Sequence, residues 1–332
     1  MKNSQHLLRW LILCTCLASS FTVAANQEGI VVDANGDYVI TYQSYAGLWQ
    51  KVTWIPATKI NPAVKWAVGP TETKTDNFVY SYTLRNNKDS RQALVGMRLS
   101  ARNALSSDPI QPAGWAGNIS LDRTSGAGFI VGWFFRRYDG HWQAGLRPGA
   151  TEGRFGFDSK DLPGVGKVAL RGATPGGQGF PDEGPRRDTP IYEEFNRIND
   201  NDFVTRLAAV PRVSVPVPYD AAGLLKGIQK HIKDDLASLQ LIESALVTQL
   251  DPWFASAIDA AKRNNSEGLR HAIKGLRRLL KQEHADVDKD DGGDSDDDDK
   301  EKRIESRIDK LAARVLDFDL RYVEKRDKGE KD

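Results

Sequence analysis

The hydrophobic period of this chain changes once, near Tyr219, and that change limits the folds open to it. Before this residue, short apolar runs are cut by Gly, Pro and Asp at intervals of roughly ten residues. After it, apolar residues recur every three or four positions as far as Tyr322. The first pattern is typical of β-strands and the second of amphipathic helices. A chain of 332 residues also exceeds the usual size of one domain, so we expect two domains, one β and one α.

The β pattern is clearest between residues 115 and 170. Residues 129–135 are apolar on both faces of an extended strand, as in the middle of a sandwich. Residues 154–158 alternate polar and apolar side chains, as a half-buried strand does. Pro148-Gly149 and Pro163-Gly164 are turn dipeptides, and Asn35-Gly36 predicts a hairpin near the start of the chain. These signals predict an immunoglobulin-like antiparallel β-sandwich rather than βαβ units.

The order of these motifs resembles a β-sandwich domain of many uncharacterised exported bacterial proteins. The resemblance covers residues 75–172 and implies a fold without implying an activity. It rests on the following residues: Trp115, Gly117, Trp133, Pro148, Gly149, Phe155, Phe157, Ser159, Leu162, Pro163 and Gly164.

Residues 1–25 have the composition of a secretory signal peptide. A positive start precedes an apolar run over 11–17, which is too short to span about 30 Å of hydrocarbon, and small residues end the segment. We expect cleavage there, export to the periplasm or the exterior, and no transmembrane helix afterwards. Cys14 and Cys16 both lie in this segment, so the mature chain is expected to have neither disulfides nor thiolate metal sites.

We expect four segments: the signal over 1–25, a β-sandwich over 29–172, a Pro/Gly-rich loop and extended strap over 173–218, and helices over 219–325. The strap either adds an edge strand to the sandwich or only joins the domains. In the last segment one helical stripe runs from Leu225 to Leu250. Three further stripes complete an antiparallel helical bundle.

The helix boundaries have recognisable caps. Asp251-Pro252 predicts the start of a new helix, and Asn264-Asn265-Ser266 predicts the start of the next. The last stripe runs from Ile304 to Tyr322. The spacing of residues 241–280 and 308–318 resembles the small helical FIMAH-type modules at the C-termini of exported bacterial proteins. This resemblance implies an attachment or interaction element, although the acidic run over 286–299 departs from the family pattern.

That acidic run contains closely spaced carboxylates and a turning glycine, which suit Ca²⁺. The candidate ligands are Asp286, Asp288, Asp290, Asp294 and Asp296. Gly292 is one place late for the EF-hand pattern, and the closing Glu is missing. The alternative is a solvated acidic loop that binds no specific ion.

A second candidate site is the segment that contains Tyr138, His141 and Trp142. Exposed aromatic rings at the tip of a sandwich stack on sugars or anchor a protein, whereas the alternative is packing against the sandwich rim. We expect Trp115 and Trp133 to lie in the core.

The chain lacks the usual catalytic motifs. Its histidines are scattered without paired zinc-ligand spacing, and it contains no nucleophile elbow and no phosphate-binding loop. Glu193 and Glu194 are adjacent acids that point in different directions, so they form a weak acid/base pair. The net charge of +1 argues against nucleic-acid binding.

These observations favour an exported non-catalytic binding or attachment protein, an adhesin or scaffold, that responds to Ca²⁺ through its acidic loop. Its expected partner is a protein or glycan surface. Two alternatives are a secreted hydrolase with a carboxylate site near Glu193 and Glu194, and a carbohydrate-binding β-sandwich.

Overall fold

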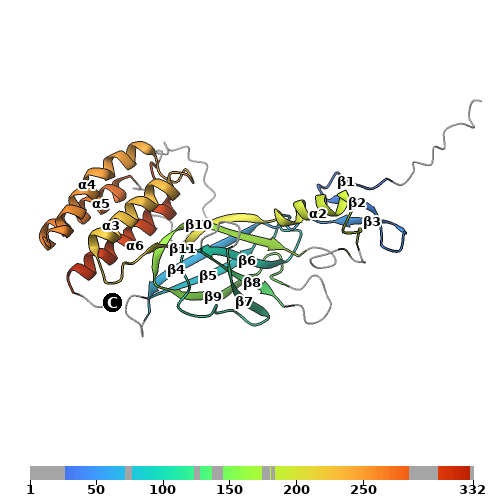
Figure 1. The fold of residues 1–332 in the computed structure, drawn as a ribbon, viewed down its shortest axis with the longest axis horizontal. Helices are drawn as coiled ribbons and strands as arrows, with labels where there is room; N and C mark the ends of the chain where they lie inside the picture. Colours follow the sequence, from blue (N-terminus) through green and yellow to red (C-terminus); the bar gives the residue numbers. More distant parts are fainter. Residues whose placement is uncertain are drawn as a thin grey trace, which may run out of the picture. The chain divides into compact units, whose positions relative to one another are not determined.

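The computed structural model describes residues 27–71, 77–122, 128–136, 145–173, 180, 184–283 and 306–329 (Figure 1). The chain divides into two compact units. Unit 1 takes Met1–Pro56 and Pro175–Asn201, and unit 2 takes Ala57–Thr174 and Asp202–Asp332. The predicted signal peptide lies outside the described residues. Within them, no helix is long and apolar enough to cross a membrane.

Unit 1 contains a three-stranded antiparallel sheet in the order β1-β2-β3, with β1 at Gly29–Val32, β2 at Tyr38–Gln43 and β3 at Trp49–Trp54. The hairpin predicted at Asn35-Gly36 is confirmed. Gly36 has a φ of 72°, and the Asp33 carboxylate accepts the backbone N–H of Asn35 at 2.8 Å. An acceptor at the first turn position and a glycine with positive φ are what such a turn requires.

Helix α2, Pro190–Asp200, covers one face of this sheet. Ile40, Tyr42 and Trp54 from the sheet form a small core with Ile191 and Phe195 of the helix. The Trp54 ring meets the Phe195 ring edge-on at 4.7 Å between centroids. Aromatic rings bury much area per residue, so a core of few side chains is enough to hold the helix on the strands.

Unit 2 contains two antiparallel sheets, one of five strands in the order β11-β10-β6-β8-β7 and one of three in the order β4-β5-β9. Their bounds are β4 Pro62–Pro70, β5 Phe78–Asn86, β6 Leu94–Ala101, β7 Trp115–Leu121, β8 Phe129–Phe135, β9 Thr151–Ser159, β10 Asp161–Gly172 and β11 Val204–Ser214.

The two sheets pack face to face through aromatic rings. Trp133 of β8 stacks on Phe157 of β9 at 6.0 Å and lies 6.2 Å from Tyr82 of β5. Trp115 meets Phe155 edge-on at 4.9 Å. Both tryptophans are buried, as predicted. Side chains alternate between buried and exposed or half-buried along β5, because every second residue of a strand faces the other sheet.

One predicted turn is wrong. Pro148-Gly149 does form a turn, with Gly149 at a φ of 83°, but Pro163-Gly164 lies inside β10. The register between β10 and β11 shifts there: Leu162 pairs with Val213 and Pro163 with Pro211, which leaves Arg212 as the extra residue of a β-bulge. Proline is tolerated at a bulge because no ladder hydrogen bond is demanded of it.

The domain boundaries also differ from those expected. The sheet of residues 29–54 belongs to unit 1 and is separate from the two sheets of unit 2. The segment 173–218, expected as a loop and strap, contains helix α2 and strand β11. Strand β11 is the edge of the five-stranded sheet, so the strap adds a strand. Its Pro211 fits there because an edge strand leaves one side of its backbone unpaired.

The remaining helices are α3 at Ala221–His231, α4 at Ser244–Lys262, α5 at Ser266–Gln282 and α6 at Lys310–Asp327, with a π-helical turn η1 at Ile232–Leu236. The long helix expected from Leu225 to Leu250 instead ends at η1, and Gln240 has a φ of 57°. Helix α4 then continues through Pro252. Asp251 does not cap a helix there, because its carboxylate binds Gln229 and Lys233. Asn265 caps α5 as predicted.

These helices share one core with the two sheets (Figure 1). Phe78 of β5 meets Tyr322 of α6 edge-on at 5.3 Å, and α6 also contacts β10. Arg277 of α5 binds Asp317 at 2.7 Å and Glu324 at 3.1 Å on α6. Residues 219–325 were expected as a separate domain, but the part of them that the structure describes belongs to unit 2.

Helix α6 brings one carboxylate into this core. Asp319 is fully buried, and neither carboxylate oxygen has a hydrogen-bond partner among the described residues. Burial raises its pKa well above the usual value for aspartate. Its charge also helps to raise the pKa of Tyr80 on β5, which indicates that the two side chains lie near each other.

Replacing Asp319 by Asn removes this ionisable group. A raised folded-state pKa means that its contribution to stability is fully present at low pH and is lost as the pH rises through that pKa. We therefore expect Asp319→Asn to flatten the fall in unfolding free energy with rising pH, and to stabilise the protein near pH 8 by about 1–3 kcal/mol. Urea unfolding between pH 5 and 9 measures both effects. Asp108→Asn, at an exposed position of unit 2, is the control, and an unchanged pH dependence in Asp319→Asn would contradict the expectation.

Candidate functional site

Both sites predicted from the sequence lie outside the described residues. This applies to the Ca²⁺ candidates Asp286, Asp288, Asp290, Asp294 and Asp296, and to Tyr138, His141 and Trp142. In the part of the chain that is described, no group of three or more His, Cys, Asp or Glu side chains could hold a metal ion.

Glu193 and Glu194 lie on the exposed side of α2. The Glu194 carboxylate binds Arg197 one turn later, at 2.6 and 2.9 Å, and this hydrogen bonding lowers the pKa of Glu194. A solvated carboxylate that is already paired makes a poor general base.

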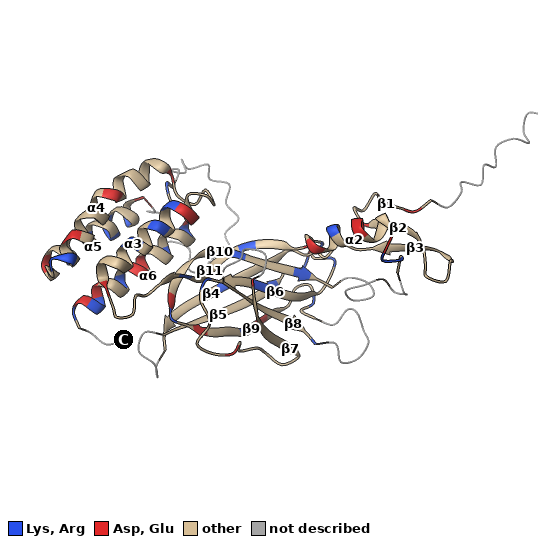
Figure 2. Ribbon diagram, in the orientation of Figure 1, with Lys and Arg blue, Asp and Glu red and all other residues tan. Residues whose placement is uncertain are grey.

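The structure instead brings together five ionisable side chains that are distant in the sequence. They lie where β6 ends, β10 begins and η1 packs on the sheet. Strands β6, β10 and β11 all carry cationic residues (Figure 2). We call them the polar cluster: Arg102, Asp161, Arg212, His231 and Asp235.

Arg212 owes its position to the bulge in β11 and to two glycines in β10. A Cβ atom on Gly164 would lie 2.5 Å from Arg212 Cβ and 2.7 Å from His231 Cε1. A Cβ atom on Gly166 would lie 3.3 Å from Arg212 Nη2. The glycines therefore leave a path free of side chains, along which Arg212 lies against the strand and reaches Ser100 Oγ at 3.1 Å.

His231 joins helix α3 to strand β10. Its ring is almost completely buried, and Nε2 accepts the backbone N–H of Val165 at 3.3 Å. Nδ1 must then carry the proton, which it donates to Asp235 Oδ2 at 2.7 Å. Asp235 belongs to η1, and π-helical turns of this kind occur frequently at functional sites.

Asp161 is the buried carboxylate of the cluster. Asn103 donates to both carboxylate oxygens of Asp161 at 2.8 and 3.0 Å. The backbone oxygen of Asp161 accepts the Tyr80 hydroxyl at 2.8 Å. Burial raises the pKa of Asp161, although hydrogen bonds from Asn103 and Ser214 and the charge of Arg102 oppose the rise. The pKa of Asp235 is lowered, chiefly by its hydrogen bond with His231, and the charges of Arg212 and Arg102 add to this.

The cluster is better suited to binding than to proton transfer. Both nitrogens of His231 are used within the fold, and both oxygens of Asp161 already accept hydrogen bonds. A general base needs a free lone pair in reach of its substrate. The groups with N–H donors still to offer are Arg102 and Arg212.

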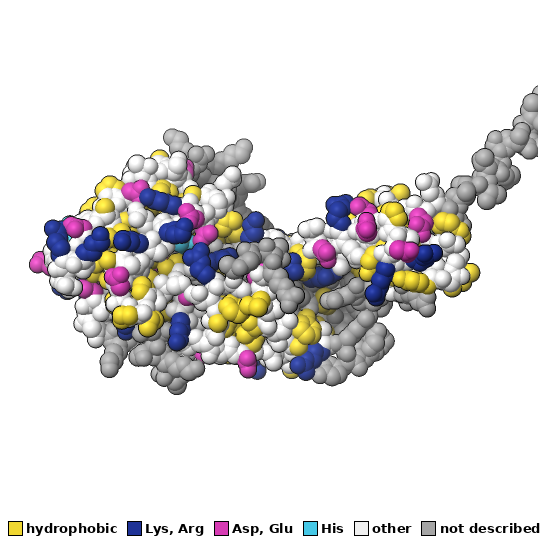
Figure 3. All heavy atoms as spheres, viewed as in Figure 1, with side chains coloured by type: hydrophobic (Ala, Val, Ile, Leu, Met, Phe, Trp, Pro, Cys, Tyr) yellow, Lys and Arg dark blue, Asp and Glu magenta, His cyan; other side chains and the backbone are white. Residues whose placement is uncertain are grey.

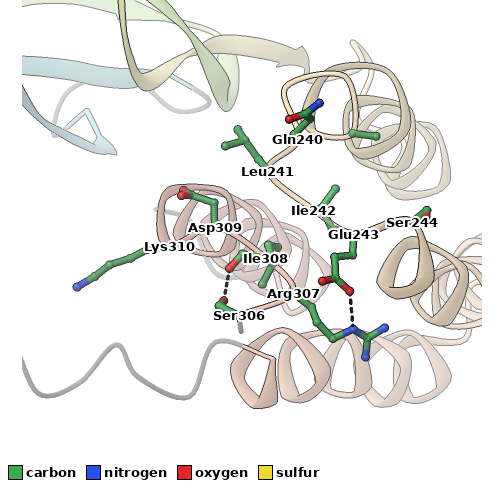
Figure 4. A pocket seen from close by; sticks show the side chains of 11 residues that line it. Gln240, Leu241, Ile242, Glu243, Ser244, Ser306, Arg307, Ile308, Asp309 and Lys310 are labelled. Carbon is green, nitrogen blue, oxygen red and sulfur yellow. Dashed lines mark hydrogen bonds and ion pairs between the residues drawn. The ribbon is translucent and has the colours of Figure 1, made fainter. Parts of the chain in front are cut away.

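A pocket of about 700 Å³ lies among the helices of unit 2 (Figure 4). Ala237 and residues 240–244 and 306–310 line it. A bridge between Ile242 and Ile308 joins the two segments. Arg307 points toward Glu243, which it binds at 3.3 Å, and it also binds Glu283 at 3.1 Å. Because Arg307 is already engaged with two carboxylates, we regard the pocket as a weaker candidate than the polar cluster.

Unit 1 offers a surface of a different kind. Of the ten exposed large apolar residues among those described, five fall in or next to β1–β3: Val31, Val32, Tyr45, Leu48 and Trp49. Figure 3 shows hydrophobic side chains open to solvent between charged ones on this unit. Val31 and Val32 pair with the start of β2, whereas Tyr45, Leu48 and Trp49 lie at its end, so both ends of this small sheet expose apolar residues. Exposed apolar surface commonly marks a contact with a partner.

The sequence matches no protein-family model, and no curated protein matches it. Among solved structures, one similar chain is an uncharacterised protein from Nocardia farcinica, whose structure is described as revealing an immunoglobulin-like fold. The two sequences are 14% identical, and the match covers 39% of this chain and 91% of that chain, with a TM-score of 0.25.

The bond between His231 and Asp235 has a testable effect on stability. A lowered folded-state pKa means that Asp235 stabilises the fold above the ordinary aspartate pKa and that this contribution is lost as the pH falls through the lowered value. We expect Asp235→Asn to reduce the unfolding free energy at pH 7 by about 1 kcal/mol, a modest value because the side chain is 33% exposed.

Denaturant unfolding at pH 7 and at successively lower pH measures this effect, which should shrink as the pH falls below the ordinary aspartate pKa. The neighbouring Asp234→Asn breaks only an exposed ion pair with Lys230, so it serves as the matched control with a smaller loss. Equal losses of unfolding free energy in the two variants would show that the bond between His231 and Asp235 stabilises the fold no more than the exposed ion pair does.

Proposed function

We propose that this chain is an exported, non-catalytic binding or attachment protein whose unit 1 makes the contact with its partner. The observation that carries the proposal is the concentration of exposed apolar residues along β1–β3. Leaving such residues in water is unfavourable, and a partner surface that covers them removes this penalty.

The loop between β2 and β3 holds three of these residues in a fixed arrangement. The Ser44 N–H donates to the Leu48 carbonyl at 2.9 Å, and Gln43 donates to the Gly47 carbonyl at 2.8 Å. The Tyr45 hydroxyl accepts the backbone N–H of Arg187 at 3.1 Å. Tyr45, Leu48 and Trp49 are 53%, 62% and 42% exposed. An ordered loop loses little entropy on binding, which favours recognition.

The hydrogen bonds within the polar cluster support a non-catalytic role. Its histidine and its buried aspartate are committed to hydrogen bonds inside the fold. The pairing of Glu194 with Arg197 likewise gives the hydrolase alternative no support. The carbohydrate-binding alternative keeps one specific observation in its favour, because exposed Trp49 and Tyr45 rings suit stacking on sugars.

Several finer expectations belong to the same proposal. The two packed sheets are proposed as an immunoglobulin-like sandwich, and α3–α6 as an antiparallel bundle of the FIMAH type. Export by residues 1–25, to the periplasm or the exterior, and a Ca²⁺ response of the acidic segment 286–299 rest on the sequence patterns alone.

The binding proposal is tested with the double variant Leu48→Ser/Trp49→Ser of the mature chain. Intact bacterial cells, peptidoglycan sacculi, chitin and cellulose are each incubated with labelled protein and sedimented. We expect the unmodified protein to sediment with at least one of them and the double variant to lose that binding tenfold or more, since buried aromatic anchors dominate interfaces.

The control is Ile110→Ser, which removes an exposed apolar residue from unit 2 and should bind normally. Equal binding by all three proteins would place the contact elsewhere. Release of soluble sugars or peptides from the same materials would replace the binding proposal by the hydrolase alternative.

The Ca²⁺ expectation has a separate test. Millimolar Ca²⁺ should raise the melting temperature of the mature protein relative to a chelator, because an ion bound only by the folded state stabilises it. Mg²⁺ at the same concentration controls for general charge screening. Identical melting temperatures with Ca²⁺ and with chelator would remove the structural Ca²⁺ site.

A further inference from the structure

We propose that the polar cluster at the end of the five-stranded sheet binds an oxyanion, the phosphate or carboxylate group of a ligand, between Arg212 and Arg102. This site is independent of the apolar surface on unit 1.

Arg212 has more donors than the fold satisfies. A guanidinium carries five N–H groups, yet among the described residues Arg212 makes one hydrogen bond, to Ser100 Oγ. Its Nε is buried and has no acceptor there. A buried donor without an acceptor costs free energy, and an oxyanion is the kind of ligand that supplies several acceptors to one guanidinium.

Arg102 adds a second guanidinium at the same place. It follows directly after β6, its side chain is exposed, and it forms no hydrogen bond or ion pair with the part of the chain that the structure describes. It lies close enough for its charge to lower the pKa of Arg212, Asp161 and Asp235. Two neighbouring arginines repel each other unless an anion lies near both.

The charge of Asp235 acts on both arginines and offsets part of this repulsion, but neither nearby carboxylate accepts an N–H from Arg102 or Arg212 among the described residues. Asp235 Oδ2 is held by His231, and both oxygens of Asp161 accept from Asn103. Neither aspartate forms an ion pair with Arg102 or Arg212 among the described residues.

The backbone around the site is unusual in three places at once. Arg212 occupies a β-bulge, Asp235 lies in a π-helical turn, and Gly164 and Gly166 give Arg212 room that a Cβ atom would close. Bulges and π-turns each interrupt regular hydrogen bonding, and both are frequent next to functional sites. Here the bulge and the two glycines act on the position of one guanidinium, and the π-helical turn places the carboxylate of Asp235 close enough for their charges to interact.

The experiment titrates the mature protein with inorganic phosphate and, separately, with acetate and citrate, at constant ionic strength set by NaCl. Calorimetry measures affinity, and thermal melting measures stabilisation. We expect saturable binding of phosphate or of the carboxylates, and whichever binds identifies the class of ligand. Arg102→Gln should weaken the affinity at least tenfold without changing the melting temperature of the free protein, because its side chain is exposed.

Arg212→Lys keeps the charge and removes the planar fork, so it should weaken binding by a similar factor. Lys226→Gln, which removes an exposed cation from α3, should bind as the unmodified protein does. Absence of saturable binding in the unmodified protein, or equal affinities in Arg102→Gln and the unmodified protein, would overturn the proposal. Failure of Arg212→Lys to fold leaves the decision to Arg102→Gln.

Discussion

The uneven pairing of strand β10 governs how unit 2 is put together. β10 pairs with β11 from Asp161 to Leu170 but with β6 only from Val168 onward. The backbone groups of its first half therefore need other partners. The His231 ring from α3 accepts the N–H of Val165, and the Tyr80 hydroxyl from the opposite sheet binds the carbonyl of Asp161. The helices thus complete a strand, which explains why they belong to the same compact unit as the sheets.

Local signals predicted most of the elements. Alternation along β5, the turns at Asn35-Gly36 and Pro148-Gly149, and the cap at Asn265 all have a short-range cause that a sequence displays. The failures involve partners far along the chain. Pro163-Gly164 forms no turn because β11 bulges opposite it, and Pro252 starts no helix because Asp251 binds residues of α3 and η1.

The polar cluster was beyond sequence reasoning for the same reason. Its members come from the end of β6, from β10 and β11, and from α3 and η1, and no spacing rule joins residue 102 to residue 235. Two weak signals were present: His231 and Asp235 are four residues apart on one helical face, and Gly164 and Gly166 alternate along a strand. Neither indicates a site alone, since such pairs and glycines have many structural uses. Only the structure shows that these residues lie beside the bulge at Arg212 and the π-helical turn η1.

Unit 1 is assembled from two stretches of chain, and residues 57–174 of unit 2 lie between them in the sequence. Its sheet is complete by Trp54, whereas the helix that covers Ile40, Tyr42 and Trp54 begins at Pro190. During synthesis from the N-terminus, these three side chains therefore remain uncovered until well over a hundred further residues have been made. A helper protein that shields nascent apolar strands would have its greatest effect in that interval.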